Sequence, residues 1–245
     1  MKLSIFFFLT LFFCSSVKTY SQDKKVAVVT FYADKSIDLS SFGAASYLAA
    51  DLVKLQENPD FNLSPMLADF HTRFLQDYSK SFPFQLVPEA EVLNSDTYKA
   101  IDPYSDWSDV MKTAVKAKYS PLEGYKAIDF LWGTQSAHNL PVLFKQYDGV
   151  MFVFITFKLI RVGFAGMGVT KIEAYANMVL YNNSGSKVFN IREYDSSKKV
   201  SPLVGGVPVM TPEKLIPMCE SALTQLMDGL QKKLPKIIKK TEAKL

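Results

Sequence analysis

The stretch that decides the fold is GVMFVFITFKLIRVGFAGMGV, residues 149–169, the most apolar part of the chain beyond its first twenty residues. Its apolar run reaches Lys158 after about ten residues, half of what a helix needs to cross a bilayer. All residues from Val150 to Ile155 are apolar, so both faces of an extended strand would be apolar. This predicts a central strand covered by helices on both sides. A membrane hairpin completed by further subunits is the alternative.

Three glycines follow this strand in the pattern G-x-x-G-x-G, the reverse of the dinucleotide fingerprint. The fingerprint needs a helix directly after it, whereas the next strand is predicted to begin near Lys171. We therefore expect Gly163, Gly166 and Gly168 to form a flexible loop between antiparallel strands. Phe164 and Met167 in this loop are candidates for contact with a partner or a lipid surface.

The part of the chain after the glycines predicts an antiparallel meander. Apolar residues alternate with Glu173, Tyr175 and Asn177 over residues 172–181, which is typical of a half-buried strand. The sequence Asn182-Asn183-Ser184-Gly185 indicates a hairpin, with KVFNIREY as the return strand. SPLVGGVPVM predicts an irregular connection, and Thr211-Pro212 then begins a helix that ends near Gln231.

The preceding residues complete the predicted order of elements. KKVAVVTFYA, residues 24–33, is a second strand buried on both faces, and apolar stripes predict helices over 42–53 and 64–81. A short strand, 84–87, and a short helix follow. The fold class is therefore α+β, an α/β sandwich with one mixed, largely antiparallel sheet and a C-terminal three-strand meander, packed by helices that include a long C-terminal one.

Residues 1–22, MKLSIFFFLTLFFCSSVKTYSQ, have the layout of a secretory signal peptide. Cys14 could be a lipoprotein cysteine, but Phe13 stands where that pattern needs a small residue, so lipid anchoring is disfavoured. We expect export to the periplasm or the cell exterior. The predicted organisation is a signal peptide at 1–22, one α/β domain at 23–234 with a possible insertion at 95–146, and a basic tail at 235–245.

The charge of the chain is concentrated at its C-terminal end. Six lysines and one glutamate lie in residues 232–245, whereas residues 23–231 hold 20 basic and 23 acidic residues. An acidic body argues against a nucleic-acid partner. The favoured interpretation of the tail is a solvated helix end beyond Pro235. Alternatively, Lys236, Lys239 and Lys240 contact an anionic membrane surface or an acidic partner, with Leu234, Ile237 and Ile238 as apolar contacts.

No residue pattern predicts catalysis, a metal or a cofactor. His71 and His138 lack metal-ligand spacing, and His71 on an apolar helix stripe is more typical of a packed residue with one hydrogen bond. Cys219 lies on another such stripe and is expected to be a buried core residue. Acidic residues cluster in two places, but solvated loops and helix caps are their usual explanation: Asp34 with Asp38, and Asp102 with Asp106 and Asp109.

The segment 95–146 is rich in aromatic residues. SDWSDVMKTAVKA, residues 105–117, is predicted to be helical with Trp107, Val110, Met111 and Ala114 on one side. Five aromatic residues of the segment could line an apolar pocket: Tyr104, Trp107, Tyr119, Tyr125 and Trp132. The segment is the candidate region for ligand specificity.

Short pieces spread over most of the mature chain resemble known envelope domains. These pieces are K-K-V-A-V-V-T-F (24–31), F-Q-L-V-P-E-A-E-V-L (84–93), F-K-Q-Y-D-G-V-M-F-V-F-I-T-F (144–157) and L-Y-N-N-S-G-S-K-V-F (180–189). They resemble the N-terminal domain of the Tol-Pal translocation protein B and the curli-export lipoprotein family. The chain departs from these families in Thr30, where a proline is usual, in its poor lipoprotein signal, and in residues 95–146.

The resemblance implies non-enzymatic work in the cell envelope, where such domains dock with other envelope proteins or assemble export machinery. The leading hypothesis is an exported envelope protein that acts through protein–protein interaction, in envelope assembly or as a secretion accessory. Its partners would be other envelope proteins, and peripheral membrane contact is compatible with the basic tail. The alternative is a periplasmic module that binds a small ligand or a lipid in an aromatic-lined pocket.

Overall fold

The computed structural model describes residues 24–43, 48–105, 107–129, 135–164 and 167–239. The predicted signal peptide with Cys14 therefore lies outside the described residues, as do Asp106, Trp132, Gly166 and Lys240. Within the described ranges, no helix combines the length and the apolar character that crossing a bilayer requires.

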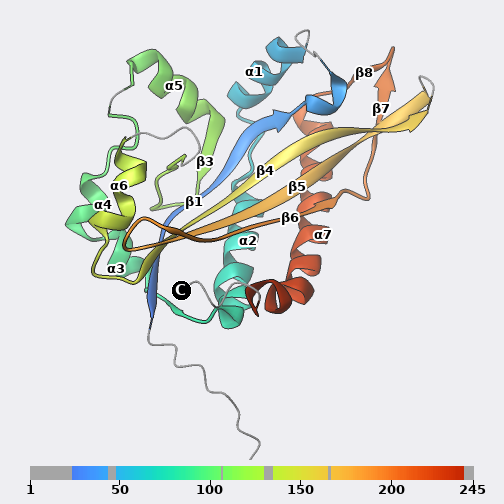
Figure 1. Cartoon of the computed structure of the whole chain (residues 1–245). Coiled ribbons are helices and arrows are strands. Elements are labelled where there is room, and N and C mark those ends of the chain that lie inside the picture. Colours follow the sequence, from blue (N-terminus) through green and yellow to red (C-terminus); the bar gives the residue numbers. More distant parts are fainter. Residues whose placement is uncertain (1–23, 44–47, 106, 130–134, 165–166, 240–245) are drawn as a thin grey trace, which may run out of the picture.

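The strands form one mixed sheet, as predicted (Figure 1). The long strands are ordered β1-β4-β5-β6, with β1 and β4 parallel and the meander β4-β5-β6 antiparallel. The short strands β2 and β3 pair with β1, and β7 pairs with the start of β5. The strands are β1 (Lys25–Asp38), β2 (Gln85–Leu86), β3 (Tyr119–Pro121), β4 (Gly149–Phe164), β5 (Met167–Asn182), β6 (Lys187–Ser196), β7 (Ser201–Val204) and β8 (Val207–Pro208).

Helices cover the sheet from both sides. In Figure 1, α2 and α7 lie behind the sheet, and α3, α4, α5 and α6 lie at its left. The α-helices are α1 (Ala49–Glu57), α2 (Ser64–Gln76), α3 (Glu89–Leu93), α4 (Asp96–Ala100), α5 (Asp109–Lys118), α6 (Gln135–Leu143) and α7 (Pro212–Lys239), with 3-10 turns η1 (Ser40–Phe42) and η3 (Tyr78–Ser81).

Strand β4 is the predicted central strand, because it pairs with β1 on one edge and with β5 on the other. Met151, Val153 and Ile155 belong to the core that α2 and α7 complete. The alternate residues of β4 belong to a second core on the opposite face of the sheet: Val150, Phe152 and Phe154. Burying a side chain as large as Phe152 contributes about 1.5–3 kcal/mol, so both layers stabilise this strand.

The strands β4 and β5 continue through Gly163 and Gly168, so the expected glycine loop is wrong at these two positions, whereas Gly166 lies outside the described residues. Gly163 pairs with Gly168, and Phe164 pairs with Met167. A Cβ atom on Gly168 would lie 2.9 Å from the carbonyl oxygen of Val162, and Gly163 has a φ of +134°. Only glycine allows this close pairing, so these glycines serve the hairpin itself.

Residues 201–208 form a small hairpin where an irregular connection was predicted. Strands β7 and β8 join at Gly205 and Gly206, whose φ angles of +60° and +83° suit a tight two-residue turn. This hairpin extends the sheet beside the distal end of β5, where Val169 pairs with Pro202.

Helix α7 begins at Pro212 as predicted, but it continues to Lys239 instead of ending near Gln231. The expected break at Pro235 is wrong, because Leu234 and Ile238 on either side of it are buried in the core. These two side chains are therefore not available as apolar contacts of a free tail. Cys219 is buried in α7 as predicted, and burial raises the pKa of its thiol well above the usual value.

The segment 95–146 supplies part of the core on the second face of the sheet, through residues that include Tyr98, Val115, Tyr119 and Leu140. The predicted apolar side of α5 is wrong: Val110 is 80 % exposed and Met111 is also exposed, whereas Val115 is buried. Helix α5 contacts α1, β1 and β3, and Val115 is its buried side chain.

Candidate functional site

Helices cover only part of the second face of the sheet, and the rest forms an exposed surface. Beyond Phe154, the alternation of β4 continues toward the hairpin tip on this face, and the antiparallel register places residues of β5, β6 and β7 beside it. We call this surface the open sheet face. It consists of Lys158, Ile160, Val162, Val169, Lys171, Glu173, Tyr175, Arg192, Tyr194, Pro202, Val204 and Val207.

A stack of three side chains stands at the middle of the open sheet face. Tyr175 pairs with Tyr194 across β5 and β6, and their rings stack with centroids 5.2 Å apart. The Arg192 guanidinium lies 4.6 Å from the Tyr175 ring centroid. The Tyr175 hydroxyl donates to Glu173 (2.7 Å), while burial and this carboxylate raise the pKa of Tyr175 to about 12. Tyr194 is 54 % exposed, so the stack presents an aromatic ring to solvent.

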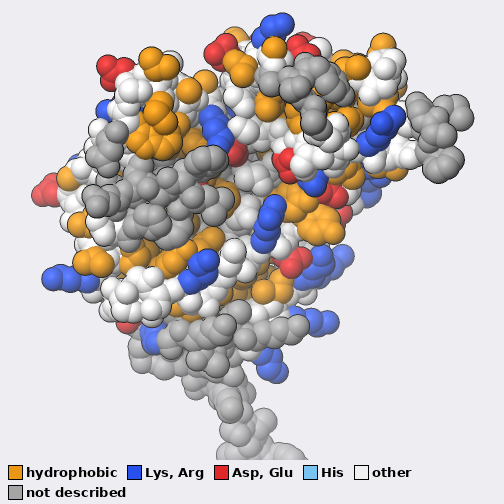
Figure 2. Space-filling view, turned by 45° about the horizontal axis from the view of Figure 1, so that its top comes forward, with side chains coloured by type: hydrophobic (Ala, Val, Ile, Leu, Met, Phe, Trp, Pro, Cys, Tyr) orange, Lys and Arg blue, Asp and Glu red, His pale blue; other side chains and the backbone are white. Residues whose placement is uncertain are grey.

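Apolar side chains occupy the distal end of the open sheet face. Val162 pairs with Val169, which pairs with Pro202, and this gives one row across three strands. Val204 pairs with Val207 in the adjacent hairpin and is 65 % exposed. Figure 2 shows basic, acidic and hydrophobic side chains intermingled on the side of the molecule that faces the viewer. The surface is therefore mixed, with no single sign of charge.

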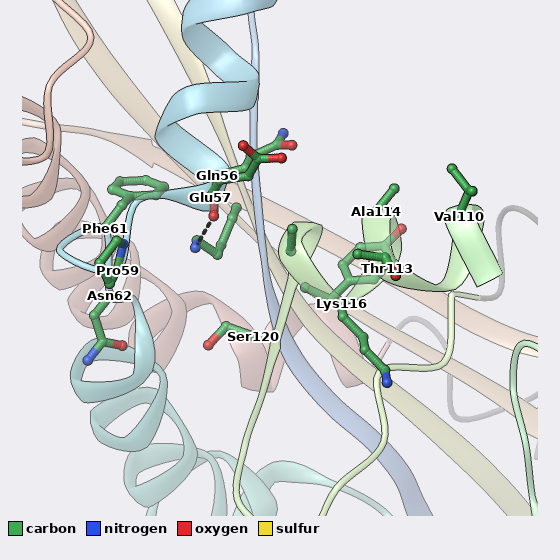
Figure 3. A pocket seen from close by; sticks show the side chains of 13 residues that line it. Gln56, Glu57, Pro59, Phe61, Asn62, Val110, Thr113, Ala114, Lys116 and Ser120 are labelled. Atoms are coloured by element: carbon green, nitrogen blue, oxygen red, sulfur yellow. Dashed lines mark hydrogen bonds between the residues drawn. The ribbon is translucent and has the colours of Figure 1, made fainter.

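A second candidate site is a groove between α1 and α5, with a volume of about 750 Å³ (Figure 3). Phe61 and Pro59 lie on one side of it, Ala114 and Val110 on the other, and Ser120 lies between the two sides. We call it the α1–α5 groove. The residues that line it are Lys35, Gln56, Glu57, Pro59, Phe61, Asn62, Val110, Thr113, Ala114, Lys116, Ala117, Tyr119 and Ser120.

Lys35 is the partly buried cation of the α1–α5 groove. Its ammonium donates a hydrogen bond to the backbone carbonyl of Gln56, drawn as the dashed line in Figure 3, and lies 5.9 Å from the Phe61 ring centroid. Burial lowers the pKa of Lys35. The Ser120 hydroxyl contacts the Ser64 hydroxyl at 3.2 Å. The groove thus combines an amine, hydroxyl groups and small apolar side chains.

Asp34 near the end of β1 is partly buried and Asp129 is buried, and each carboxylate has a partner. Asp34 accepts a hydrogen bond from the Ser36 amide (2.7 Å) and lies 3.6 Å from the Lys118 ammonium. Burial raises the pKa of Asp34 even though Lys118 opposes this effect. Asp129 accepts a hydrogen bond from the Tyr119 hydroxyl. These contacts connect β1, β3 and α5. This structural role explains why Asp34 and Asp129 are present without a catalytic function.

His71 behaves as the packed residue that its position predicted. Its Nε2 lies 2.7 Å from Glu89 Oε1, and the Phe31 ring packs edge-on against the imidazole at a centroid distance of 5.0 Å. Tyr125 donates a second hydrogen bond to the same carboxylate oxygen. Burial raises the pKa of Glu89, but the hydrogen bonds from His71 and Tyr125 outweigh it, so the pKa ends below its usual value. The arrangement links α2 to α3.

The structure divides the predicted pocket aromatics between different environments. Tyr104 contacts Trp107, with ring centroids 5.3 Å apart, and donates to the Ala127 carbonyl. Tyr119 lies in the core on the second face and lines the α1–α5 groove, whereas Tyr125 lies in the core on the first face. Trp132 lies outside the described residues. Of the described four, only Tyr119 lines the α1–α5 groove.

The remaining predicted contact residues lie at two ends of the molecule. Phe164 and Met167 pair at the tip of the β4–β5 hairpin, where the described structure covers their backbones. Lys236 and Lys239 are exposed on the last turns of α7.

The described acidic residues of the middle segment occupy helix and turn positions. Asp102 accepts a hydrogen bond from the Tyr104 amide (3.0 Å), and Asp109 is exposed in the first turn of α5. His138 lies within α6, but its side chain is outside the described structure. The two carboxylates therefore lie in separate elements, Asp102 in a turn and Asp109 in α5.

Sequence reasoning missed Lys35, Arg192 and Tyr194. The polar residues of KVFNIREY fall on alternate positions, so the exposed face of β6 was visible in the pattern. Lys35 gave no such signal, because its groove is assembled from segments far apart in the chain. In comparisons with known proteins, neither a protein-family model nor a curated protein matches this chain.

Proposed function

We propose that this chain is an exported, non-enzymatic envelope protein that acts through protein–protein interaction in envelope assembly or secretion. The observation that supports the proposal best is the open sheet face. A sheet normally buries large apolar and aromatic side chains against another layer, whereas here Tyr194, Val204 and Val207 are left exposed. The natural occupant of such a surface is another protein.

The residue types of the open sheet face favour this interpretation. Tyrosine and arginine are enriched in protein interfaces and dominate their binding energy. Here Arg192, Tyr175 and Tyr194 form one stack, so their side chains are held in place before a partner binds. Preorganised side chains lose less conformational entropy on binding.

The N-terminal sequence and the family resemblance point the same way. A signal peptide at 1–22 would deliver the chain to the periplasm or beyond, and the lipoprotein pattern around Cys14 is poor. The resemblance to the N-terminal domain of the Tol-Pal translocation protein B and to the curli-export lipoprotein family supports a docking role in the envelope. Exposed Lys236 and Lys239 are compatible with peripheral membrane contact.

The test is affinity capture of the tagged full chain from its host after mild crosslinking, followed by identification of the captured proteins. We expect the unaltered protein to capture the same partner reproducibly. The double variant Arg192→Ala/Tyr194→Ala should capture at least tenfold less of this partner. The matched control Val142→Ala/Lys145→Ala removes one apolar and one cationic side chain from the region of α6. Val142 is 57 % exposed and belongs to a different surface.

Capture that is unchanged in the Arg192→Ala/Tyr194→Ala variant would exclude the open sheet face as the docking surface. Repeated absence of any specific partner would reject the protein-binding function itself. Equal melting temperatures of the variants and the unaltered protein establish that the loss is not caused by unfolding.

A second candidate function is that of a periplasmic module that binds a small ligand or a lipid. It is favoured by the α1–α5 groove, whose volume of about 750 Å³ lies in the range of small-molecule sites. Native mass spectrometry of the protein purified from its host tests this function. A bound small molecule is the expected result, and a protein that is consistently empty contradicts it.

A further inference from the structure

The α1–α5 groove exists because the side chains that face it from α5 are small. Val110, Thr113, Ala114 and Ala117 follow one another at the spacing of a single helix stripe. The two alanines end at Cβ, so they do not reach across to Phe61 and Gln56 on the other side (Figure 3). The part of α5 that packs into the core is a different stripe, through Val115. The groove side of α5 therefore faces α1 across the groove instead of packing into the core.

The groove holds Lys35, a cation for which the described part of the chain supplies no ion pair. Lys35 contributes a hydrogen bond to a backbone carbonyl at the C-terminal end of α1, an interaction that stabilises a helix end. An ammonium has three N–H donors, and this contact uses one of them. Among the described residues, no carboxylate forms an ion pair with Lys35, and its neighbour Asp34 faces Lys118 instead.

The surroundings of Lys35 favour an anionic group. Burial already weakens the protonated state of this lysine, so a carboxylate beside it would be stabilised by an incompletely solvated cation. The side chains that line the groove include two lysines, Lys35 and Lys116, and one glutamate, the exposed Glu57. The balance is positive, although the body of the chain as a whole is acidic. The net positive charge of the lining would repel a cationic ligand.

We propose that the α1–α5 groove binds a small amphiphile whose carboxylate pairs with Lys35 and whose apolar chain lies along Ala114, Ala117 and Val110. This inference rests on the second candidate function and names its ligand class, and it is independent of protein binding at the open sheet face. The hydroxyl of Ser120 lies between the two sides of the groove and adds a polar group to its lining (Figure 3). Burying a short alkyl chain would add about 0.8 kcal/mol for each methylene group removed from water.

The test uses three soluble probes of equal chain length in titration calorimetry with the full mature chain: octanoate, octan-1-ol and octylammonium. We expect octanoate to bind at least tenfold more tightly than octanol, and octylammonium to bind more weakly than either. Lys35→Met should abolish the preference for octanoate over octanol, whereas Lys35→Arg should retain it because the positive charge remains. Ala114→Phe should fill the groove and weaken both octanoate and octanol at least tenfold.

The control variant is Lys54→Met, which removes an exposed lysine from α1 outside the groove lining and should leave all three affinities unchanged. Binding of octanoate and octanol with equal affinity, unaffected by Lys35→Met, would overturn the carboxylate inference while leaving a ligand-binding groove in place. Failure of every probe to bind would overturn the inference as well. The second candidate function is tested separately, by native mass spectrometry of the protein purified from its host. Melting temperatures confirm that each variant is folded.

Discussion

At the scale of single residues, Thr30 shows how one side chain attaches a whole segment. The register of β1 and β4 shifts between Val28 and Thr30, which is a β-bulge. The buried Thr30 hydroxyl donates to the Lys126 carbonyl (2.7 Å) and accepts from the Ile128 amide (3.1 Å). Thr30 therefore anchors residues 126–128 to the sheet.

Replacing Thr30 by valine keeps the shape of the side chain but removes both hydrogen bonds. Two buried polar groups would lose their partner, so we expect Thr30→Val to lower the free energy of unfolding by about 2 kcal/mol or more. Thr30→Ser keeps the hydroxyl and removes one methyl group, which should cost about 1 kcal/mol. Urea unfolding measures both values. A Thr30→Val protein as stable as the unaltered one would show that the hydroxyl is dispensable.

Glu89 predicts part of the acid sensitivity of the protein. Its pKa in the folded state lies below the usual value, because the hydrogen bonds from His71 and Tyr125 outweigh burial. A depressed carboxylate pKa contributes stability above the unfolded-state pKa of about 4.3, and this contribution is lost as the pH falls through the folded-state pKa. Glu89→Gln should therefore lose less stability than the unaltered protein between about pH 5 and pH 3. Urea unfolding across this range measures the free energy of unfolding of both proteins at each pH. An equal loss of stability in both proteins would contradict the prediction.

At the scale of secondary-structure elements, α5 shows which side of a helix the fold selects. The composition of this helix suggested that Val110 and Met111 face inward, but Val115 is the buried residue. Val115→Ala should therefore lower the free energy of unfolding by about 1–3 kcal/mol, whereas Val110→Ala on the same helix should change it by less than about 0.5 kcal/mol. The two substitutions are chemically identical. Equal losses in thermal unfolding would indicate that α5 packs through both sides.

Helix α7 continues through Pro235, and this proline should be a point of strain. A proline inside a helix removes one backbone hydrogen bond and costs about 3 kcal/mol relative to alanine in an ideal helix. The exposed Pro235 lies between the buried Leu234 and Ile238, so core packing holds the helix together there. Pro235→Ala should raise the free energy of unfolding by about 1–3 kcal/mol. Pro212→Ala, at the first helical position where proline is favourable, should bring no gain. Thermal unfolding decides, and an unchanged melting temperature for Pro235→Ala contradicts the expectation.

At the scale of the whole molecule, the two core layers share one sheet. The first layer joins the sheet to α2 and α7, and the second joins the same strands to residues 95–146. Because β1 and β4 carry buried side chains on both faces, neither layer should unfold without disturbing the other. The described residues of the segment 95–146 that belong to the second layer are therefore expected to unfold together with the sheet.

The two tryptophans test this cooperativity directly, because Trp107 and Trp132 both lie in the segment 95–146. Unfolding followed by tryptophan fluorescence should coincide with unfolding followed by far-ultraviolet circular dichroism, which reports on all helices and strands. Phe144→Ala in the second layer should shift both transitions by the same amount and cost about 3–5 kcal/mol. A fluorescence transition at lower temperature would mean that residues 95–146 unfold on their own.

The sequence by itself determined the features that depend on neighbouring residues. The alternation in β5 and the unbroken apolar run of β4 identified the centre of the sheet, since strand periodicity is a local property. The proline and threonine before α7 marked its start, and the stripe through Cys219 identified its buried side. From these elements the α+β class with its C-terminal meander followed.

Only the tertiary structure decided where those elements leave surface uncovered. The passage of α7 through Pro235, the pairing of β7 with β5 and the side on which α5 packs all depend on contacts between distant segments. The same is true of the open sheet face and of the α1–α5 groove with Lys35. A groove or an uncovered sheet face exists only where side chains from distant segments do not fill it. The sequence around the groove or the face therefore does not predict it.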